Sequence, residues 1–397
     1  MEIYAEKLIM RDNVIQSAFI YAKNGVITQV MENNAGHNAA ECSINPPKIS
    51  QNDVYGDCLK AYYVAPGFID PHIHGSCGFD IMDFDMPQLE AWLSHLLDIG
   101  VSAVLPSVYT APISIMQNSL LLINKAMKAQ KDGLLGGAAI MGIHLEGPFI
   151  NAERLGGMDG NYILSPSVDN YLDIAKGFEN SIKIVTLAPE LHGAPELIKY
   201  LRNQGVRILA GHTDATYDEG VRAFEAGVSG ICHFYNACRG IHHREPGILA
   251  LALVKQDIQC ELIGDGTHVH QGAMDLLFRL KDCLRLTLIS DSVKTTGMPD
   301  GEYEENGQIV LVHKGESRLK GGALHGGSCM LPDIVKKLAA NDGTDKADIV
   351  RMASYSAREY LGRISKIKKG EPVDLVGMDK NMNVLWTVLG NDARIKA

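Results

Sequence analysis

Residues 65–75 read APGFIDPHIHG and place two histidines, His72 and His74, at the end of an apolar run. The preceding residues 61–64 (AYYV) have the composition of a buried strand. Side chains at positions i and i+2 of an extended chain point to the same side, so the two imidazoles are expected to face the same way. Such a pair suits a metal ion, but it also arises by chance. Whether the two histidines are metal ligands depends on which other polar residues the fold brings near them.

Strand-like and helix-like segments alternate along the central part of the chain. Helical apolar spacing occurs in residues 86–100, 113–130 and 217–227, which lie between strand candidates. This alternation predicts a parallel α/β fold, and eight units fit a closed (β/α)8 TIM-like barrel. An open doubly wound sheet is the alternative, but no G-x-G-x-x-G follows the first strand. The strand candidates are 62–70, 101–106, 138–145, 182–187, 206–211, 229–234, 258–264 and 286–291.

The two chain ends have a different character. Residues 18–32 (AFIYAKNGVITQVME) read as two short strands around an Asn-Gly turn. Residues 372–391 (PVDLVGMDKNMNVLWTVLGN) have the same strand-turn-strand pattern. We therefore expect residues 1–60 and 366–397 to form one small β-sandwich domain beside a barrel of residues 61–365.

Composition narrows the class of protein. The 397-residue chain carries a formal net charge of −10 without a long basic run, which argues against nucleic acid or an anionic membrane surface as a partner. A small anionic substrate is still compatible with this charge. No apolar run approaches the roughly 18 residues of a membrane span, and the N-terminus lacks a signal peptide pattern. The eight cysteines show no C-x-x-C spacing, so we expect reduced thiols in a cytoplasmic protein.

Polar side chains gather where the predicted strands end, which is where barrel enzymes build their active sites. A lone histidine at such a position is more often structural, and a carboxylate there can simply cap the next helix. The joint pattern is more specific, because imidazole and carboxylate ligands together are what a catalytic divalent metal needs. The predicted ligand set is His72, His74, Glu146, His212, His233 and Asp291.

The chemistry follows from these residue types. A metal with an open position lowers the pKa of bound water to roughly 7 and yields hydroxide at neutral pH. Asp291, at the end of the last strand, could accept the proton of that water and hand it to a leaving group. The sequence therefore predicts hydrolysis of a C–N or ester bond.

Seven motifs in order carry a resemblance to a known family: APGFIDPHIHG, GIHLEGPFI, AGHTDAT, HFYNA, REPG, DGTHV and SDS. Together they resemble the amidohydrolase superfamily and, within it, the N-acetylglucosamine-6-phosphate deacetylases, over essentially the whole chain. Many relatives in the superfamily bridge two metals with a carboxylated lysine after strand 4. Here residues 181–190 (SIKIVTLAPE) end without a lysine, and Glu146 matches the glutamate that takes this role in the deacetylases.

The resemblance implies an activity and a set of roles. The activity is metal-dependent deacetylation of an N-acetylhexosamine 6-phosphate, with N-acetyl-D-glucosamine 6-phosphate as the leading substrate, by hydroxide attack on the amide. One or two divalent ions, Zn or Fe first, would be bound in each subunit of a homodimer. The implied roles are main-metal ligands Glu146, His212 and His233, second-metal ligands His72 and His74, general acid–base Asp291, sugar-phosphate contacts Asn236, Ala237 and His268, and Arg244 reaching the phosphate in the neighbouring subunit.

Several positions depart from the family pattern. Met158 stands where the family carries a histidine that polarises the substrate amide, and methionine cannot donate a hydrogen bond. Amide activation would then depend on the metal. Residues 324–328 read LHGGS in place of Leu-Ala-Gly-Ser. Another amidohydrolase activity, on a different acylated amine, a cyclic amide, a dipeptide or N-acetylgalactosamine 6-phosphate, therefore stays open. A catalytically inactive scaffold is the third reading, but it would be expected to have lost some ligands.

Overall fold

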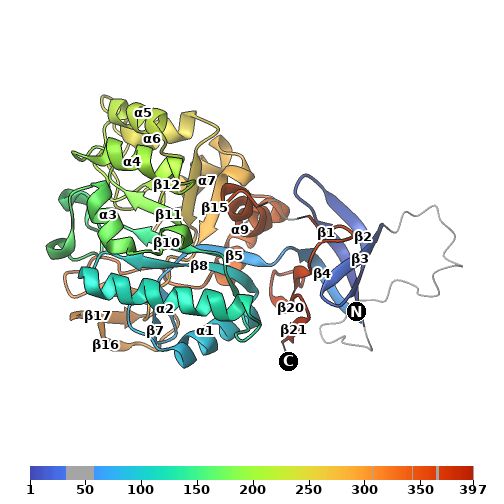
Figure 1. Cartoon of the computed structure of the whole chain (residues 1–397). Helices are drawn as coiled ribbons and strands as arrows, with labels where there is room; N and C mark the ends of the chain where they lie inside the picture. Colours follow the sequence, from blue (N-terminus) through green and yellow to red (C-terminus); the bar gives the residue numbers. More distant parts are fainter. Residues whose placement is uncertain (33–57, 306, 342, 364–365, 397) are drawn as a thin grey trace, which may run out of the picture.

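A computed structural model describes residues 1–32, 58–305, 307–341, 343–363 and 366–396. Its main body is a parallel sheet whose eight principal strands follow one another in chain order, with helices packed outside it (Figure 1). This confirms the predicted (β/α)8 TIM-like barrel. The strands are β5 (Phe68–Ile73), β8 (Val101–Tyr109), β10 (Ile143–Glu146), β11 (Ile182–Leu187), β12 (Arg207–Ala210), β13 (Gly230–Ile231), β14 (Gln259–Ile263) and β15 (Leu286–Ile289), with β9 (Ala139–Ile140) paired to β8.

The helices begin at recognisable caps. The Asp85 side chain accepts from the Gln88 N–H, and the Gln88 side chain accepts from the Asp85 N–H, a reciprocal capping box. Thr216 and Glu219 form the same arrangement at α5. The helices are α1 (Met86–Asp98), α2 (Ile113–Lys131), α3 (Val168–Ala175), α4 (Ala194–Asn203), α5 (Tyr217–Ala226), α6 (Gly247–Val254), α7 (Gln271–Leu280), α8 (Leu331–Ala339) and α9 (Lys346–Tyr360), with short 3₁₀ turns η1 (Ala152–Arg154), η2 (Gly160–Tyr162), η3 (Glu179–Ser181) and η4 (Cys283–Arg285).

The first and last barrel strands meet at one seam. The Asp291 N–H, just beyond the end of β15, donates to the carbonyl of His72 near the end of β5 at 3.0 Å. The Ser290 N–H approaches Oδ1 of the buried Asp70 at 3.3 Å. The seam therefore brings Asp291 directly beside His72, the first histidine of the H-x-H pair, although the two residues are 219 positions apart in the sequence.

The predicted first strand, 62–70, is in fact two strands in different sheets. β4 (Cys58–Ala65) ends before Pro66, and β5 begins at Phe68. Proline supplies no N–H to a ladder, and Gly67 lies so close to Ser102 that a Cβ on it would be 2.3 Å from the serine Oγ. The chain therefore leaves one sheet and enters the other at Pro66–Gly67.

Both chain ends form the separate β structure that the sequence predicts. It is a seven-stranded sheet in the order β21-β20-β19-β4-β1-β2-β3, with its own apolar core. Asn24 and Gly25 join β2 and β3 with φ values of 53° and 73°, as the Asn-Gly signal predicts. Residues 33–57 of the predicted domain, Cys42 among them, lie outside the described residues. The remaining strands of this sheet are β1 (Glu2–Ile9), β2 (Val14–Lys23), β3 (Val26–Glu32), β19 (Asp374–Met378), β20 (Val384–Leu389) and β21 (Asp392–Ile395).

A small antiparallel sheet is inserted between β15 and α8. It consists of β16 (Gly301–Glu305), β17 (Gln308–His313) and β18 (Glu316–Leu319) and lies on the barrel side of the molecule (Figure 1). A two-stranded ribbon, β6 (Gly75–Ser76) and β7 (Phe79–Asp80), follows β5. The strand count from sequence included neither element. The ribbon strands have two residues each, β16 and β18 are mostly polar, and β17, although rich in aliphatic residues, lies beyond the last predicted barrel strand.

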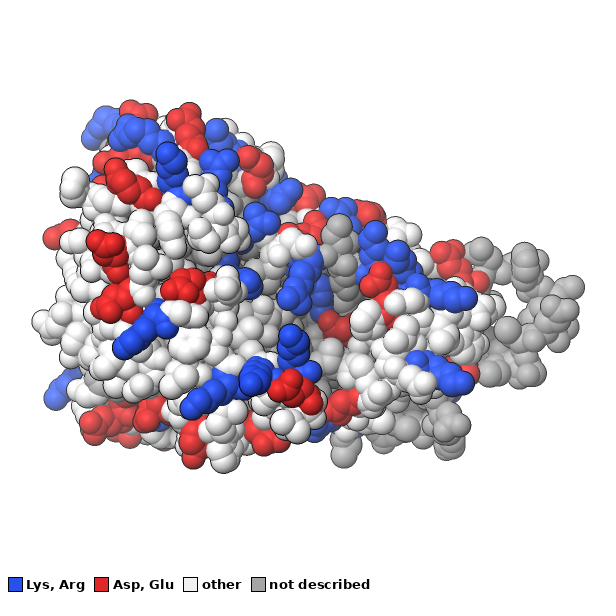
Figure 2. All heavy atoms as spheres, in the orientation of Figure 1, with Lys and Arg blue, Asp and Glu red and all other residues white. Residues whose placement is uncertain are grey.

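The surface carries mixed charge. On the face seen in Figure 2, basic and acidic side chains are interspersed over the described part of the molecule. No described helix is long and apolar enough to cross a bilayer. The seven described cysteines are free thiols.

Candidate active site

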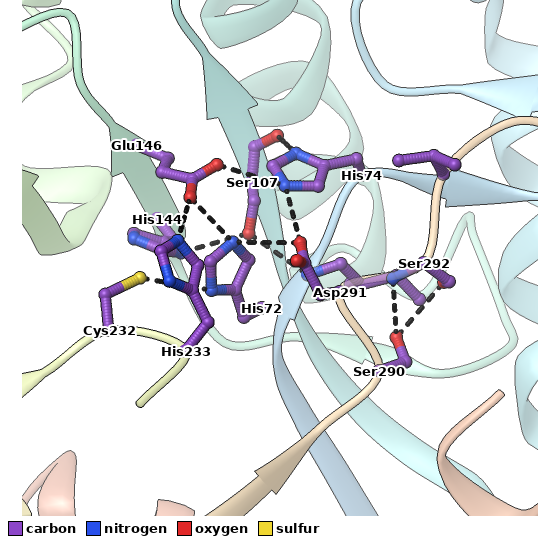
Figure 3. Close-up of polar contacts among 12 residues, drawn as sticks. His72, His74, Ser107, His144, Glu146, Cys232, His233, Ser290, Asp291 and Ser292 are labelled. Atoms are coloured by element: carbon purple, nitrogen blue, oxygen red, sulfur yellow. Dashed lines mark hydrogen bonds and ion pairs between the residues drawn. The ribbon is translucent and has the colours of Figure 1, made fainter. Parts of the chain in front are cut away.

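Glu146, the last residue of β10, lies at the centre of a cluster of imidazoles (Figure 3). The glutamate is 3% exposed, so its charge must be balanced by neighbours rather than by water. One carboxylate oxygen lies close to three of the imidazole rings, and the other oxygen lies close to the fourth. Oε1 lies 3.4 Å from His72 Nε2, 3.2 Å from His212 Nε2 and 3.0 Å from His233 Nε2, and Oε2 lies 3.2 Å from His74 Nε2.

Asp291 joins the same cluster from the other side. Its Oδ1 is 3.4 Å from His72 Nε2 and 3.2 Å from His74 Nε2. The two histidines of the H-x-H motif therefore lie between two carboxylates, and Figure 3 shows all of these side chains pointing toward one another. The structure thus brings together all six side chains of the predicted ligand set.

Backbone carbonyls fix the tautomer of three of these rings. A carbonyl oxygen only accepts, so the nitrogen facing it must carry the hydrogen. The other ring nitrogen, Nε2, then presents a lone pair in the neutral imidazole, as a metal ligand must. The three contacts are His74 Nδ1 to Ser107 O at 2.8 Å, His212 Nδ1 to Arg154 O at 2.8 Å, and His233 Nδ1 to Asn236 O at 3.1 Å.

This arrangement suits a divalent cation. The Nε2 atoms of His212 and His233 are 3.1 Å apart, and both also face Glu146 Oε1. Three lone-pair atoms at such distances repel one another unless a cation or additional protons lie among them. The buried Nε2 of His72 also lacks a hydrogen-bond partner within the described residues. Imidazole and carboxylate ligands of this kind suit Zn, Fe, Mn or Co.

The direction of the pKa shifts agrees with that interpretation. Burial disfavours the charged form of His74, but hydrogen bonds and charge from Asp291 and Glu146 outweigh it and raise its pKa to about 10. Burial also disfavours the charged form of Glu146 and would raise the pKa of its carboxyl, yet the surrounding imidazoles hold that pKa well below the usual range. The carboxylates thus attract positive charge to this point, and a bound metal would provide it in place of protons.

Glu261 is a residue that the sequence reasoning missed. It is 1% exposed on β14, and its Oε2 lies 3.1 Å from His72 Nδ1. Carboxylates commonly hold metal-binding histidines in this way, fixing the ring and raising its basicity. Its signal in the sequence was a charge inside the otherwise uncharged strand Gln259–Ile263. Cys232 Sγ approaches the same nitrogen at 3.5 Å, so this thiol lies at the edge of the cluster.

His144, two residues before Glu146, has a different setting. Its Nδ1 lies 3.1 Å from Ser107 Oγ and its Nε2 lies 2.8 Å from Thr186 Oγ1. Burial and the neighbouring imidazoles lower its pKa well below the ordinary value. Because hydroxyl groups contact both of its nitrogens, His144 has no nitrogen free for a metal, and it packs against the cluster as a neutral ring.

A cavity of about 660 Å³ opens onto the cluster. Glu146, His74 and Asp291 line one part of it, and Met158 lines another. The predicted sugar-phosphate residues Asn236, Ala237 and His268 also line this cavity. Asn236 and Ala237 follow His233 in a tight loop, where Ala237 has a φ of 48°.

His268 is held by a second residue that the predicted site omitted, Asp265. Asp265 Oδ2 lies 2.9 Å from His268 Nδ1 and accepts hydrogen bonds from the N–H and hydroxyl of Ser328 at 3.0 and 2.9 Å. Burial would raise the pKa of this carboxyl, but these partners, His268 first, hold it well below the usual range. Asp265 thereby fixes two segments of the cavity wall.

Arg244 is the predicted residue that the structure does not bring to this cavity. It is exposed, and its Nη1 lies 3.0 Å from His243 Nε2 within the same loop. Arg244 is not among the residues that line the cavity of its own chain. A role in a neighbouring subunit remains a prediction.

Known proteins resemble this chain in sequence and in fold. Residues 63–397 match the amidohydrolase family. The N-acetylgalactosamine-6-phosphate deacetylase of Escherichia coli O157:H7 is 33% identical over 334 residues, covering 82% of this chain and 86% of the relative. The N-acetylglucosamine-6-phosphate deacetylase of Bacillus subtilis (strain 168) is 32% identical over 395 residues, 98% of each chain. An N-acetyl-D-glucosamine-6-phosphate deacetylase mutant from Mycobacterium smegmatis, solved with N-acetyl-D-glucosamine-6-phosphate, superposes with a TM-score of 0.87 at 25% identity, covering 100% of this chain and 99% of that one.

Proposed function

The chain belongs to the amidohydrolase family and is a hydrolase of amide bonds, and from this premise we propose that it deacetylates an N-acetylhexosamine 6-phosphate. The leading substrate is N-acetyl-D-glucosamine 6-phosphate, and the products are the amino sugar phosphate and acetate. One observation carries the proposal: Glu146 places its two oxygens between the His212–His233 pair and the H-x-H pair, at the mouth of a cavity large enough for a sugar phosphate.

The residues of the cluster would form two neighbouring metal positions. Glu146, His212 and His233 would hold the main ion, and His72 with His74 would hold a second ion next to Asp291. When bound, a divalent ion of this kind, with Zn and Fe the first candidates, polarises a carbonyl and makes water nucleophilic at neutral pH. Glu261 supports the second position by fixing the ring of His72.

Asp291 is the proposed general acid–base. Burial opposes its charge, but the charges and hydrogen bonds of His72 and His74 lower the pKa of its carboxyl, so it is ready to act as a base at neutral pH. Asp291 accepts a proton from the attacking water and returns it to the amide nitrogen as the C–N bond breaks. The acyl carbon leaves as acetate, and the sugar keeps the amine.

Residues on the other wall of the cavity are suited to the sugar phosphate. His268, oriented by Asp265, provides an imidazole, and Asn236 with the backbone N–H of Ala237 provides further groups that can receive an anion. We also propose a homodimer in which Arg244 of each chain reaches the phosphate in the other. A planar guanidinium suits two phosphate oxygens, and the exposed position of Arg244 leaves it available to a neighbour.

The contribution of the second metal position can be tested separately. In the double variant H72A/H74A, one half of the cluster is removed while Glu146, His212 and His233 stay in place. We expect acetate release to be abolished and the metal content to fall. Turnover close to that of the parent protein would show that one metal is enough.

Acetate release from the 6-phosphates of N-acetylglucosamine, N-acetylgalactosamine and N-acetylmannosamine tests the reaction and the substrate together. N-Acetylgalactosamine 6-phosphate is the second candidate, because a 33% identical relative bears that substrate in its name. Purified protein would be assayed with and without added Zn or Fe. Metal-dependent release from one epimer supports the proposal. No release from any of them, with metal demonstrably bound, would contradict it and direct the search to other acylated amines and cyclic amides.

We place this reaction in the cytoplasm. The seven described thiols are free, and Cys232 and Cys260 are buried without a disulfide partner among the described residues. Reduced cysteines of this kind are typical of the cytoplasmic redox environment. Fractionation of the source cells, followed by detection of the chain in the soluble or membrane fraction, checks this assignment.

A further inference from the structure

An imidazole–carboxylate pair outside the metal cluster also lines the active-site cavity. His325 lies in the loop between β18 and α8, and Glu305 ends β16. The Nε2 of His325 is 3.3 Å from Glu305 Oε1, and the two side chains are 15% and 3% exposed. Neither residue has a role in the reaction as described so far.

Glu305 is the buried partner that holds the imidazole. Among the described residues, no lysine or arginine lies within ion-pair distance of Glu305, and His325 is its one basic partner. Within the same part of the chain, neither His325 Nε2 nor Glu305 Oε2 has a hydrogen-bond partner, so both buried atoms can engage a further group in the cavity. Nε2 faces the carboxylate, and Nδ1 is the other ring nitrogen available to a bound ligand.

Two consecutive glycines locate His325 relative to the cluster. A Cβ on Gly156 would lie 3.3 Å from His212 Cε1, and a Cβ on Gly157 would lie 3.2 Å from His325 Nδ1. The loop of His325 is also tied to the general acid–base, because the Gly327 N–H donates to the Asp291 carbonyl at 2.7 Å. His325 therefore lines the same cavity as the cluster, with Gly156–Gly157 between it and His212, and its loop contacts the backbone of Asp291.

Amide hydrolysis places negative charge on the carbonyl oxygen, and a fixed donor aimed at that oxygen accelerates the reaction. Met158, next to Gly157 on the same wall, cannot donate. We propose that His325, oriented by Glu305, donates a hydrogen bond to the amide oxygen of the bound substrate. This inference rests on the proposed deacetylase function and adds a catalytic residue to it.

Kinetics of His325→Ala and Glu305→Gln provide the first test. Loss of a donor to the developing oxyanion lowers kcat by about 100- to 1,000-fold, with little change in KM. The His325→Gln variant keeps an N–H donor and should recover part of the lost activity. His313→Ala is the matched control, because His313 forms a similar pair with Asp300 at 3.2 Å in the same inserted sheet but is exposed and outside the cavity.

Ligand binding separates contact with the amide oxygen from contact with the sugar or phosphate. The probes are glucosamine 6-phosphate, which has no acyl oxygen, and its N-methylphosphonamidate, which imitates the tetrahedral intermediate. We expect His325→Ala to bind the phosphonamidate about 100-fold more weakly, with unchanged affinity for glucosamine 6-phosphate and unchanged metal content. Equal weakening for both probes, or no weakening for either, would overturn the inference. A parent protein that deacetylates none of the amino sugar phosphates would instead overturn the proposed function.

Discussion

At the residue scale, the site depends on side chains that hold the ligands as much as on the ligands themselves. Glu261 is the clearest case, because it contacts His72 on the side away from Glu146. The ring of His72 is fully buried between these two carboxylates. Its orientation toward the cluster is therefore set by a residue on a different strand.

Replacement of Glu261 by glutamine tests that support. The substitution keeps the size of the side chain but removes the charge that raises the basicity of His72. Outer-shell substitutions of this kind weaken metal binding or activity by about 10- to 100-fold. Competition with a chromogenic chelator measures the change, and Glu225→Gln on the exposed surface of α5 is the control. Unchanged metal affinity in Glu261→Gln would show that the contact is not functional.

Asp265 should make stability depend on pH. Its carboxyl has a depressed pKa in the folded protein, so its contribution is present above the unfolded pKa of about 3.9 and is lost as the pH falls toward the folded value. We expect Asp265→Asn to destabilise the protein by about 1–3 kcal/mol at pH 7, and by clearly less at pH 3. Urea unfolding at the two pH values measures this, with the exposed Asp257→Asn as control. An equal penalty at both pH values would contradict the account.

The residues closest to strand ends could be read from the sequence, and their more distant partners could not. His72 lies at the end of β5, and His212 and His233 come two residues after β12 and β13, so the barrel prediction alone placed them on one face. The contact between Glu305 and His325 joins an inserted strand to a later loop, and nothing in local spacing signals it. Such pairings become visible only when the tertiary fold is known.

At the element scale, the loop of residues 324–328 positions Asp291. Gly327 packs so tightly against the end of β15 that a Cβ on it would lie 1.9 Å from the Ser290 carbonyl oxygen. The same residue donates its N–H to Asp291. Any side chain at this position must therefore displace either the loop or the backbone of the general acid–base.

The Gly327→Ala variant is expected to lose activity more than stability. A displacement of about 1 Å at a catalytic group can reduce the rate about 100-fold, while overpacking of this kind destabilises by about 1–3 kcal/mol. Steady-state kinetics and thermal unfolding measure the two effects. Gly321→Ala is the control in the same region, because a Cβ there meets nothing within 4 Å. Parent-like kinetics in Gly327→Ala would show that the loop does not position Asp291.

Most of the elements could be predicted, and the exceptions have physical reasons. The long helices showed clear apolar periodicity, and α2 (Ile113–Lys131) matches the predicted segment closely. The run 62–70 looked continuous, because hydrophobicity alone cannot show that a chain passes from one sheet to another. Proline at position 66 was the local signal of that break.

At the scale of the whole molecule, some residues of the terminal sheet join the apolar core of the barrel, in addition to the core that the sheet has of its own. Ile9, Tyr63 and Val384, from three strands of the terminal sheet, belong to the same apolar cluster as the barrel residues. Helix α9 lies at the junction, where Arg358 donates to the Gly67 carbonyl at 2.8 Å and pairs with Asp374. We therefore expect the barrel and the terminal sheet to unfold as one unit.

Trp386→Ala tests this coupling from the side far from the active site. Trp386 is 2% exposed, and its indole N–H donates to the Lys60 carbonyl at 2.9 Å. Its loss should destabilise by about 3–5 kcal/mol and lower the melting temperature in a single calorimetric transition. Ile395→Ala, on the neighbouring strand and 47% exposed, should have a small effect. Two separate transitions in Trp386→Ala would contradict the coupling.

The central claim is that the Glu146 cluster holds a divalent metal that the deacetylation requires. The most direct test measures metal content and acetate release from N-acetylglucosamine 6-phosphate in the parent protein, before and after a chelator strips it and after Zn or Fe is restored, with Glu146→Gln in parallel. The account predicts that activity disappears with the metal, returns in proportion to the metal restored, and does not return in Glu146→Gln. Full acetate release by the stripped protein, or by Glu146→Gln without bound metal, would contradict it.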